Sequence, residues 1–173
     1  MIVFSGNLQG EVPNKILNLG EKQAEEALLW WKEQFGDDFY IELMRHGQED
    51  EDRVNQTLLA FARKHNVKVV ATNNTYYINQ DDSNAHDILL CVRDAEKQST
   101  PIGRGRGFRF GLPNQEYYFK SETEMKQLFQ DVPEAIINIQ EIVDKIEEYT
   151  LYRDVLLPKF DIPAEFIHAE DEI

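Results

Sequence analysis

Two short apolar runs, 39-FYIELM-44 and 67-VKVVA-71, decide the fold of this chain together with the pattern between them. Both runs are rich in β-branched and aromatic residues, which favour β-strands. Between them, Val54, Leu58 and Phe61 recur at the spacing that places side chains on one face of a helix. A strand, a helix and a second strand in this order form a βαβ unit, whose strands pair in parallel. The sequence therefore predicts an α/β fold with mainly parallel strands.

The segment before this unit predicts one strand and two helices. Residues 1–5 predict a short buried strand because of Ile2, Val3 and Phe4, and residues 12–19 predict a short helix that ends at Gly20. Residues 21–35 predict a longer helix that ends at Gly36. Its apolar stripe consists of Ala24, Ala27, Leu28, Trp31 and Phe35.

Three further helices and one strand are expected after the βαβ unit. A helix should begin near residues 81–83 and run to about residue 92, and residues 116–120 should form a strand. Ser121 and Glu124 form a capping box, and another helix follows Pro133. The side chains expected to face inward are Ala85, Ile88, Leu89 and Val92 in the first of these helices and Ile136, Ile139, Val143 and Ile146 in the last.

Composition narrows the class of protein. The chain has 173 residues, with 18 Lys and Arg against 32 Asp and Glu, for a net charge of −14. A surface this acidic repels phosphate backbones, so direct contact with nucleic acid is not expected. No apolar run approaches the ~20 residues of a membrane helix, and the first residues lack the pattern of a signal peptide. The single cysteine, Cys91, excludes an internal disulfide. A cytoplasmic location is expected.

Two histidines are candidate cleft residues. His46 follows the first strand of the βαβ unit, and His86 lies on the helix after the 73–75 loop. Both can approach the carboxyl edge of the sheet, where α/β proteins gather their active sites. The alternative for each is an ordinary loop or helix-surface histidine, which is the commoner case for a single residue without a motif. The four histidines of the chain have no ligand-like spacing, so they predict no zinc site.

The stretch 103-GRGRG-107 is similar to an arginine–glycine RNA-binding segment. Arg104, Arg106 and Arg109 would then form an RNA-binding module. The run is short and stands in a strongly acidic chain, so a solvated loop is the favoured interpretation.

Eight segments, in this order and at this spacing, resemble the PHP (polymerase and histidinol phosphatase) domain of bacterial DNA polymerase III alpha subunits. They are 6-GNLQGEVP-13, 35-FGDDFYIEL-43, 45-RHG-47, 70-VATNN-74, 85-AHDILLC-91, 116-EYYFKS-121, 128-LFQDVPEA-135 and 157-LPKF-160.

The resemblance implies a distorted (β/α)7 barrel of which this chain is a part that lacks the first strands. Residues 1–150 would be the C-terminal portion of a PHP domain. Residues 151–173, which carry two prolines and an acidic end, would be a linker toward a polymerase palm that is absent from the sequence.

The same resemblance places three positions where metal-binding members carry ligands. Such members resemble Gly-Cys-Leu at residues 6–8 and Asn-Asp-x-His at residues 73–76, whereas this chain has Asn7, Asn74 and Tyr76. Neutral amides bind divalent metals poorly, and a tyrosine must first lose its proton. We therefore expect no intact metal site and no cofactor here. The three side chains are expected to hydrogen-bond one another instead.

These implications favour a structural role within a replicative polymerase. The parent chain would synthesise DNA with Mg²⁺, while this piece, without catalytic residues, would support the polymerase. Its partners would be the remaining domains of the chain and the proofreading exonuclease, and the isolated piece is expected to form homo-oligomers through open sheet edges. The alternative is a standalone metal-dependent phosphoesterase of the PHP family.

Overall fold

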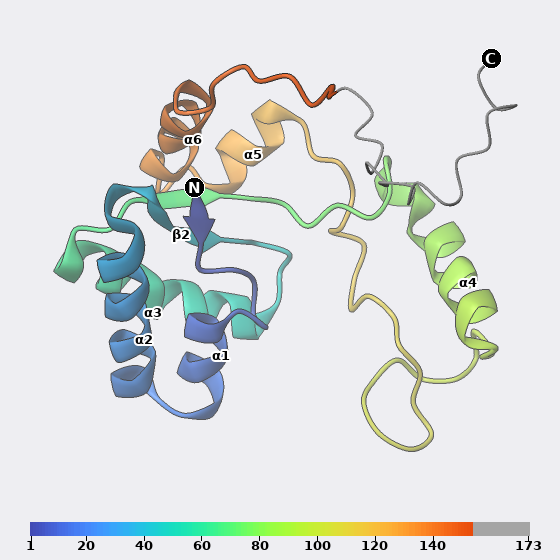
Figure 1. Ribbon diagram of the computed structural model, residues 1–173. Coiled ribbons are helices and arrows are strands. Elements are labelled where there is room, and N and C mark those ends of the chain that lie inside the picture. Colours follow the sequence, from blue (N-terminus) through green and yellow to red (C-terminus); the bar gives the residue numbers. More distant parts are fainter. Residues whose placement is uncertain (154–173) are drawn as a thin grey trace, which may run out of the picture.

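The computed structural model describes residues 1–153 (Figure 1). A three-stranded parallel sheet with strand order β1-β2-β3 lies at its centre. The strands are β1 (Val3–Phe4), β2 (Phe39–Leu43) and β3 (Val69–Ala71). Val3 pairs with Phe39, and Ile41 pairs with Val69. The predicted α/β class and parallel pairing are confirmed.

Helices connect and surround these strands. In Figure 1, α1, α2 and α3 form one group, α5 and α6 lie on the other side of the strands, and α4 stands apart from the rest. The helices are α1 (Glu11–Asn18), α2 (Glu21–Phe35), α3 (Glu49–His65), α4 (Ser83–Asp94), α5 (Glu122–Leu128) and α6 (Glu134–Asp144). Two 3₁₀ turns, η1 (Gly36–Asp38) and η2 (Gln80–Asp82), precede β2 and α4. Within residues 1–153, no helix is both long and apolar enough to cross a bilayer.

Helix α3 links β2 to β3 and completes the predicted βαβ unit. Its first turn holds four acidic residues and its last turn three basic ones, which complements the helix dipole at both ends. Asn66 ends the helix in the left-handed conformation, with φ 52°. The local sequence thus fixes both boundaries of the crossover.

The hydrophobic core lies between the sheet and the helices around it. Alternate residues of β2, namely Phe39, Ile41 and Leu43, point into it and are fully buried. The predicted stripe of α2 is confirmed, because Ala24, Ala27 and Leu28 are buried and Trp31 and Phe35 pack against the core.

Several expected details are wrong at the periphery. Residues 1–5 shorten to a two-residue edge strand, and residues 116–120 form no strand, since only Tyr118 makes a bridge, to Tyr77. The stripes expected to face inward on α4 and α6 lie mostly at the surface. The buried residues of these two helices are Leu90, Cys91 and Ala135 instead. An amphipathic stripe shows which face of a helix can be buried, but a surface must lie opposite for burial to occur. Three strands do not offer that surface to every helix.

Two neighbouring leucines of α2, one buried and one exposed, give a direct test of the core. Leu28 is 0% exposed and the adjacent Leu29 is 42% exposed. We expect L28A to lower the free energy of unfolding by about 2–5 kcal/mol, because it leaves a cavity. L29A, the matched control, should cost less than about 1 kcal/mol. Urea denaturation of the chain measures both, and equal losses would contradict the described packing.

Candidate functional site

The carboxyl ends of the three parallel strands meet at one edge of the sheet, where α/β proteins place their sites. Asn7 follows β1, His46 follows β2, and Asn74 follows β3. Thr72 and Glu42 lie at the same edge, and the Thr72 hydroxyl donates to the Glu42 carboxylate at 2.6 Å.

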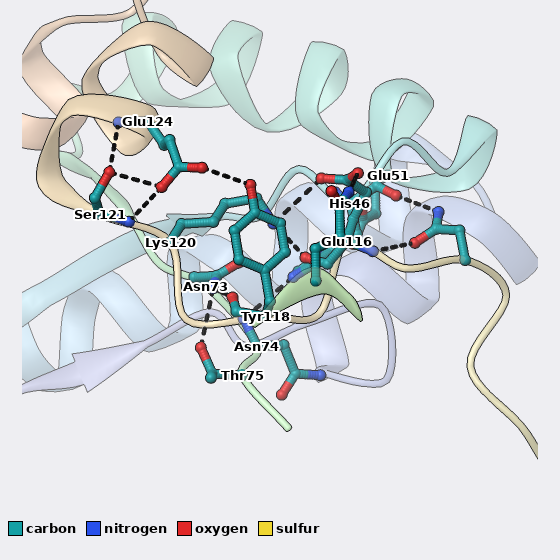
Figure 2. A network of polar contacts seen from close by, with 12 residues as sticks. His46, Glu51, Asn73, Asn74, Thr75, Glu116, Tyr118, Lys120, Ser121 and Glu124 are labelled. Carbon is teal, nitrogen blue, oxygen red and sulfur yellow. Dashed lines mark hydrogen bonds and ion pairs between the residues drawn. The ribbon is translucent and has the colours of Figure 1, made fainter. Parts of the chain in front are cut away.

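His46 is the centre of this edge and is 1% exposed (Figure 2). Its Nδ1 lies 2.8 Å from Oε1 of Glu51, a buried residue in the first turn of α3. The other carboxylate oxygen of Glu51 accepts from the backbone N–H of His46 at 2.5 Å. The two residues therefore form a closed pair in which one carboxylate holds both the ring and the backbone of His46.

The second ring nitrogen is also occupied. The backbone N–H of Asn74 donates to Nε2 of His46 at 3.2 Å. Since a backbone N–H can only donate, Nε2 is the acceptor and Nδ1 carries the proton, so the ring is a neutral imidazole. The ring lies flat against Tyr117, with centroids 4.4 Å apart and planes 5° apart.

Two amide side chains complete the surroundings of the pair. Asn114 donates to the carbonyl oxygen of His46 at 2.5 Å, and Gln48 donates to the Tyr117 hydroxyl at 2.6 Å. One buried ring thus ties together the ends of β2 and β3, the start of α3 and the segment 114–117.

The electrostatics follow from this arrangement. Burial raises the pKa of the Glu51 carboxyl, but hydrogen bonds from the ring and backbone of His46 lower it by more, so the pKa lies below its usual value. Burial, with the nearby Glu51 charge and Tyr76, raises the pKa of Tyr117 to about 12. Glu51 is therefore ionised and Tyr117 protonated at neutral pH.

The neighbour of His46 is also fixed. Arg45 forms a bidentate pair with Asp131, at 2.6 and 2.9 Å, and donates to the carbonyl of Leu128. The guanidinium of Arg45 holds the pKa of the Asp131 carboxyl below its usual range. The segment 45–47 is therefore tied to α3 by one residue and to the end of α5 by the other.

The three positions expected to replace metal ligands do not form the expected network. Asn7 is exposed and accepts from the backbone N–H of Gln9 within its own turn. Asn74 reaches the Tyr76 hydroxyl only at 3.4 Å, in an exposed contact. The expectation of a three-way hydrogen-bonded cluster is wrong, because the turn after β1 satisfies Asn7 locally.

The donors at this edge do not fit a metal centre. Among residues 1–153, no three His, Cys, Asp or Glu side chains are grouped as metal ligands. His46 and Glu51 already engage each other, and a hollow of only about 20 Å³ lies beside Asn7. Of the remaining positions, Glu42 offers a carboxylate that accepts from Thr72, and the others offer neutral amides and a phenol, which are poor ligands for a divalent ion.

His86, the second candidate cleft residue, lies on α4 and makes no hydrogen bond to His46 or Glu51. It lines an open cavity of about 230 Å³ with Tyr77, Asn84, Asp87 and others. Its ring lies 5.5 Å from those of Tyr76 and Tyr77. The structure therefore does not join the two histidines in one polar network.

The arginines of the 103–109 segment have different roles. Arg109 is buried and bidentate to Asp87 of α4, at 2.6 and 2.8 Å, which lowers the pKa of that carboxyl. Arg104 and Arg106 are exposed on the loop. Since Arg109 is part of an internal ion pair, the three do not form one basic surface.

A second polar cluster lies beside the first in Figure 2. Ser121 and Glu124 form the predicted capping box of α5, and the Tyr118 hydroxyl donates to Glu124 at 2.8 Å. Hydrogen bonds from Ser121 and then Tyr118 hold the pKa of Glu124 at about 2. This cluster anchors the segment 118–121 to the start of α5.

Sequence reasoning missed Glu51, Gln48, Tyr117 and Asn114. The signal available was Glu51 itself, an acidic residue five positions after a strand-end histidine and one turn into a helix. Tyr117 and Asn114 come from a distant segment, and no local pattern indicates their contact with His46.

The sequence is similar to DNA polymerase III alpha subunits from several bacteria. The chain is 36% identical over 167 residues to the DNA polymerase III subunit alpha of Borreliella burgdorferi, 37% over 177 residues to that of Campylobacter jejuni, and 33% over 174 residues to that of Treponema pallidum. These matches cover 96%, 96% and 100% of this chain. The chain is homologous to a segment of DNA polymerase III alpha subunits.

The homologous segment is a small part of each alpha subunit. The chain spans about 14% of the length of these relatives. No protein-family model matches the sequence.

The His46–Glu51 pair predicts a strong effect of an uncharged substitution. E51Q keeps the shape but turns an N–H donor toward one of the two N–H groups of His46, and we expect a loss of about 1–3 kcal/mol in unfolding free energy. E49Q removes the same charge from an exposed position in the same helical turn and should change it by less than about 0.5 kcal/mol. Urea denaturation measures both. An E51Q variant whose free energy of unfolding equals that of the wild type would contradict the pairing.

The pair also predicts a pH dependence. Because the pKa of Glu51 is lowered in the folded state, its contribution is present above the unfolded-state value of ~4.3 and is lost as pH falls through the folded value. The difference in unfolding free energy between wild type and E51Q should therefore be constant near neutral pH and shrink below about pH 4. A difference that grows on acidification would have the wrong sign. Other carboxyls cancel in this comparison.

Proposed function

We propose that this chain is a structural segment of a DNA polymerase III alpha subunit, a degenerate PHP domain that supports the polymerase without catalysing a reaction itself. Homology over nearly the whole chain supports the alpha-subunit assignment. The PHP assignment and the (β/α)7 barrel rest on the eight matching segments, and the small parallel sheet is compatible with them.

The observation that supports the structural role is that His46 and Glu51 are hydrogen-bonded to each other and to the backbone around them. Both ring nitrogens and both carboxylate oxygens have partners within the protein. An imidazole whose two nitrogens are both hydrogen-bonded within the protein is poorly placed to bind a metal or to transfer a proton to a substrate. What the pair does well is hold the strand ends in one geometry, since hydrogen bonds to a charged group contribute about 1.5–3 kcal/mol each.

Polymerisation would then take place elsewhere in the subunit. Template-directed nucleotidyl transfer with two metal ions, Mg²⁺ in this proposal, needs carboxylates beyond those described here. The remaining domains of the subunit are the proposed partners of this segment, the proofreading exonuclease is a further one, and the cytoplasm is the proposed location. Residues 1–150 would belong to the PHP domain. The linker proposed for residues 151–173 lies almost wholly outside the described residues.

The decisive experiment uses the full-length protein that contains this sequence. We expect E51Q to lower its melting temperature while primer extension at a permissive temperature stays within about twofold of wild type, because the pair stabilises and does not catalyse. E49Q is the matched control for both measurements.

The same preparations test the alternative of a metal-dependent phosphoesterase. Phosphate release from a model phosphomonoester with added Mn²⁺ or Zn²⁺ should be absent in wild type. Release that E51Q abolishes and E49Q leaves intact would overturn the structural role.

A further inference from the structure

Helix α4 carries an apolar stripe that faces solvent. Ile88 is 45% exposed, Leu89 63% and Val92 73%, and Ala85 beside them is also exposed. These positions follow the i, i+3, i+4, i+7 spacing of a helix face made for burial. Folded monomers rarely leave such a contiguous aliphatic face open. In Figure 1 the helix stands clear of the other helices.

The orientation of the stripe is fixed by contacts on the rest of α4. Asp87 receives two hydrogen bonds from the buried Arg109 and one from Gln98, which also donates to Asn84. Leu90 and Cys91 are buried. These contacts prevent α4 from rotating about its own axis. The aliphatic stripe therefore cannot turn inward against the described residues.

We propose that Ala85, Ile88, Leu89 and Val92 are covered by another segment of the same alpha-subunit polypeptide. The inference rests on the proposed function. Its chemistry favours a permanent interface, because the stripe holds no charged or polar side chain and obligate interfaces are the more apolar kind. In the relatives, the homologous segment is about 14% of one continuous chain, so most of such a chain is available to cover the stripe. The covering surface is therefore an apolar helix or sheet face of that chain.

Cysteine labelling in the full-length protein tests this cover. L89C and V92C are prepared singly, with K97C as a matched control at an exposed position just after α4. Reaction with a maleimide is followed by mass spectrometry of the peptide concerned, in the native and the urea-unfolded protein. We expect the native L89C and V92C thiols to react at least about tenfold more slowly than when unfolded, because reaction then requires local opening. K97C should react at nearly the unfolded rate.

Each other outcome overturns the proposal. Native rates at L89C and V92C close to the unfolded rates would show an open stripe, and equal protection of K97C would show general occlusion. Protection that appears only on concentrating a dilute monomer would assign the stripe to a second copy, and protection that needs an added subunit would assign it to a separate protein. Primer extension by the same preparations tests the proposed function separately, so protected thiols in an inactive protein would overturn that function and leave the cover standing.

Discussion

The hydrogen-bonded pair of His46 and Glu51 is the interaction on which the rest of this structure depends. It closes the end of β2 onto the first turn of α3, and its second ring nitrogen holds the loop after β3. Tyr117 covers the ring from a segment about 70 residues away. Because a buried polar group without a partner is costly, each member of this network requires the others. The network therefore fixes the strand ends that a short sheet alone would hold weakly.

Under the proposed function, this arrangement explains how an edge that is usually catalytic in α/β proteins can have a structural role. The carboxyl ends of parallel strands bring loops together whatever their side chains do. Here these loops supply a neutral ring, an engaged carboxylate and amides, which satisfy one another. The homologous segment is about 14% of the alpha subunit that it matches, and rigid support is the role proposed for it above.

The sequence predicted the local structure well and the long-range contacts poorly. The βαβ unit, the bounds of α2 and the capping box at Ser121 follow from patterns within a few residues, and the structure confirms them. The buried partner of His46 could not be found in the same way, because it depends on how α3 folds back on the loop before it. The stripe of α4 was recognised, but its burial was predicted against a surface that residues 1–153 do not supply. The homology to alpha subunits was predicted from segments spread along the chain, so it did not depend on any single long-range contact.

The protonation state of one ring tests the central claim most directly. Long-range ¹H–¹⁵N NMR spectra of the His46 ring distinguish a protonated Nδ1 from a protonated Nε2, and titration with Zn²⁺ shows whether Nε2 is open to a metal. A structural pair predicts the Nδ1–H form at neutral pH and ring signals that Zn²⁺ does not move. An Nε2–H form, or an Nε2 signal that shifts at stoichiometric Zn²⁺, would contradict the account. The second result would show that this edge of the sheet can bind a metal.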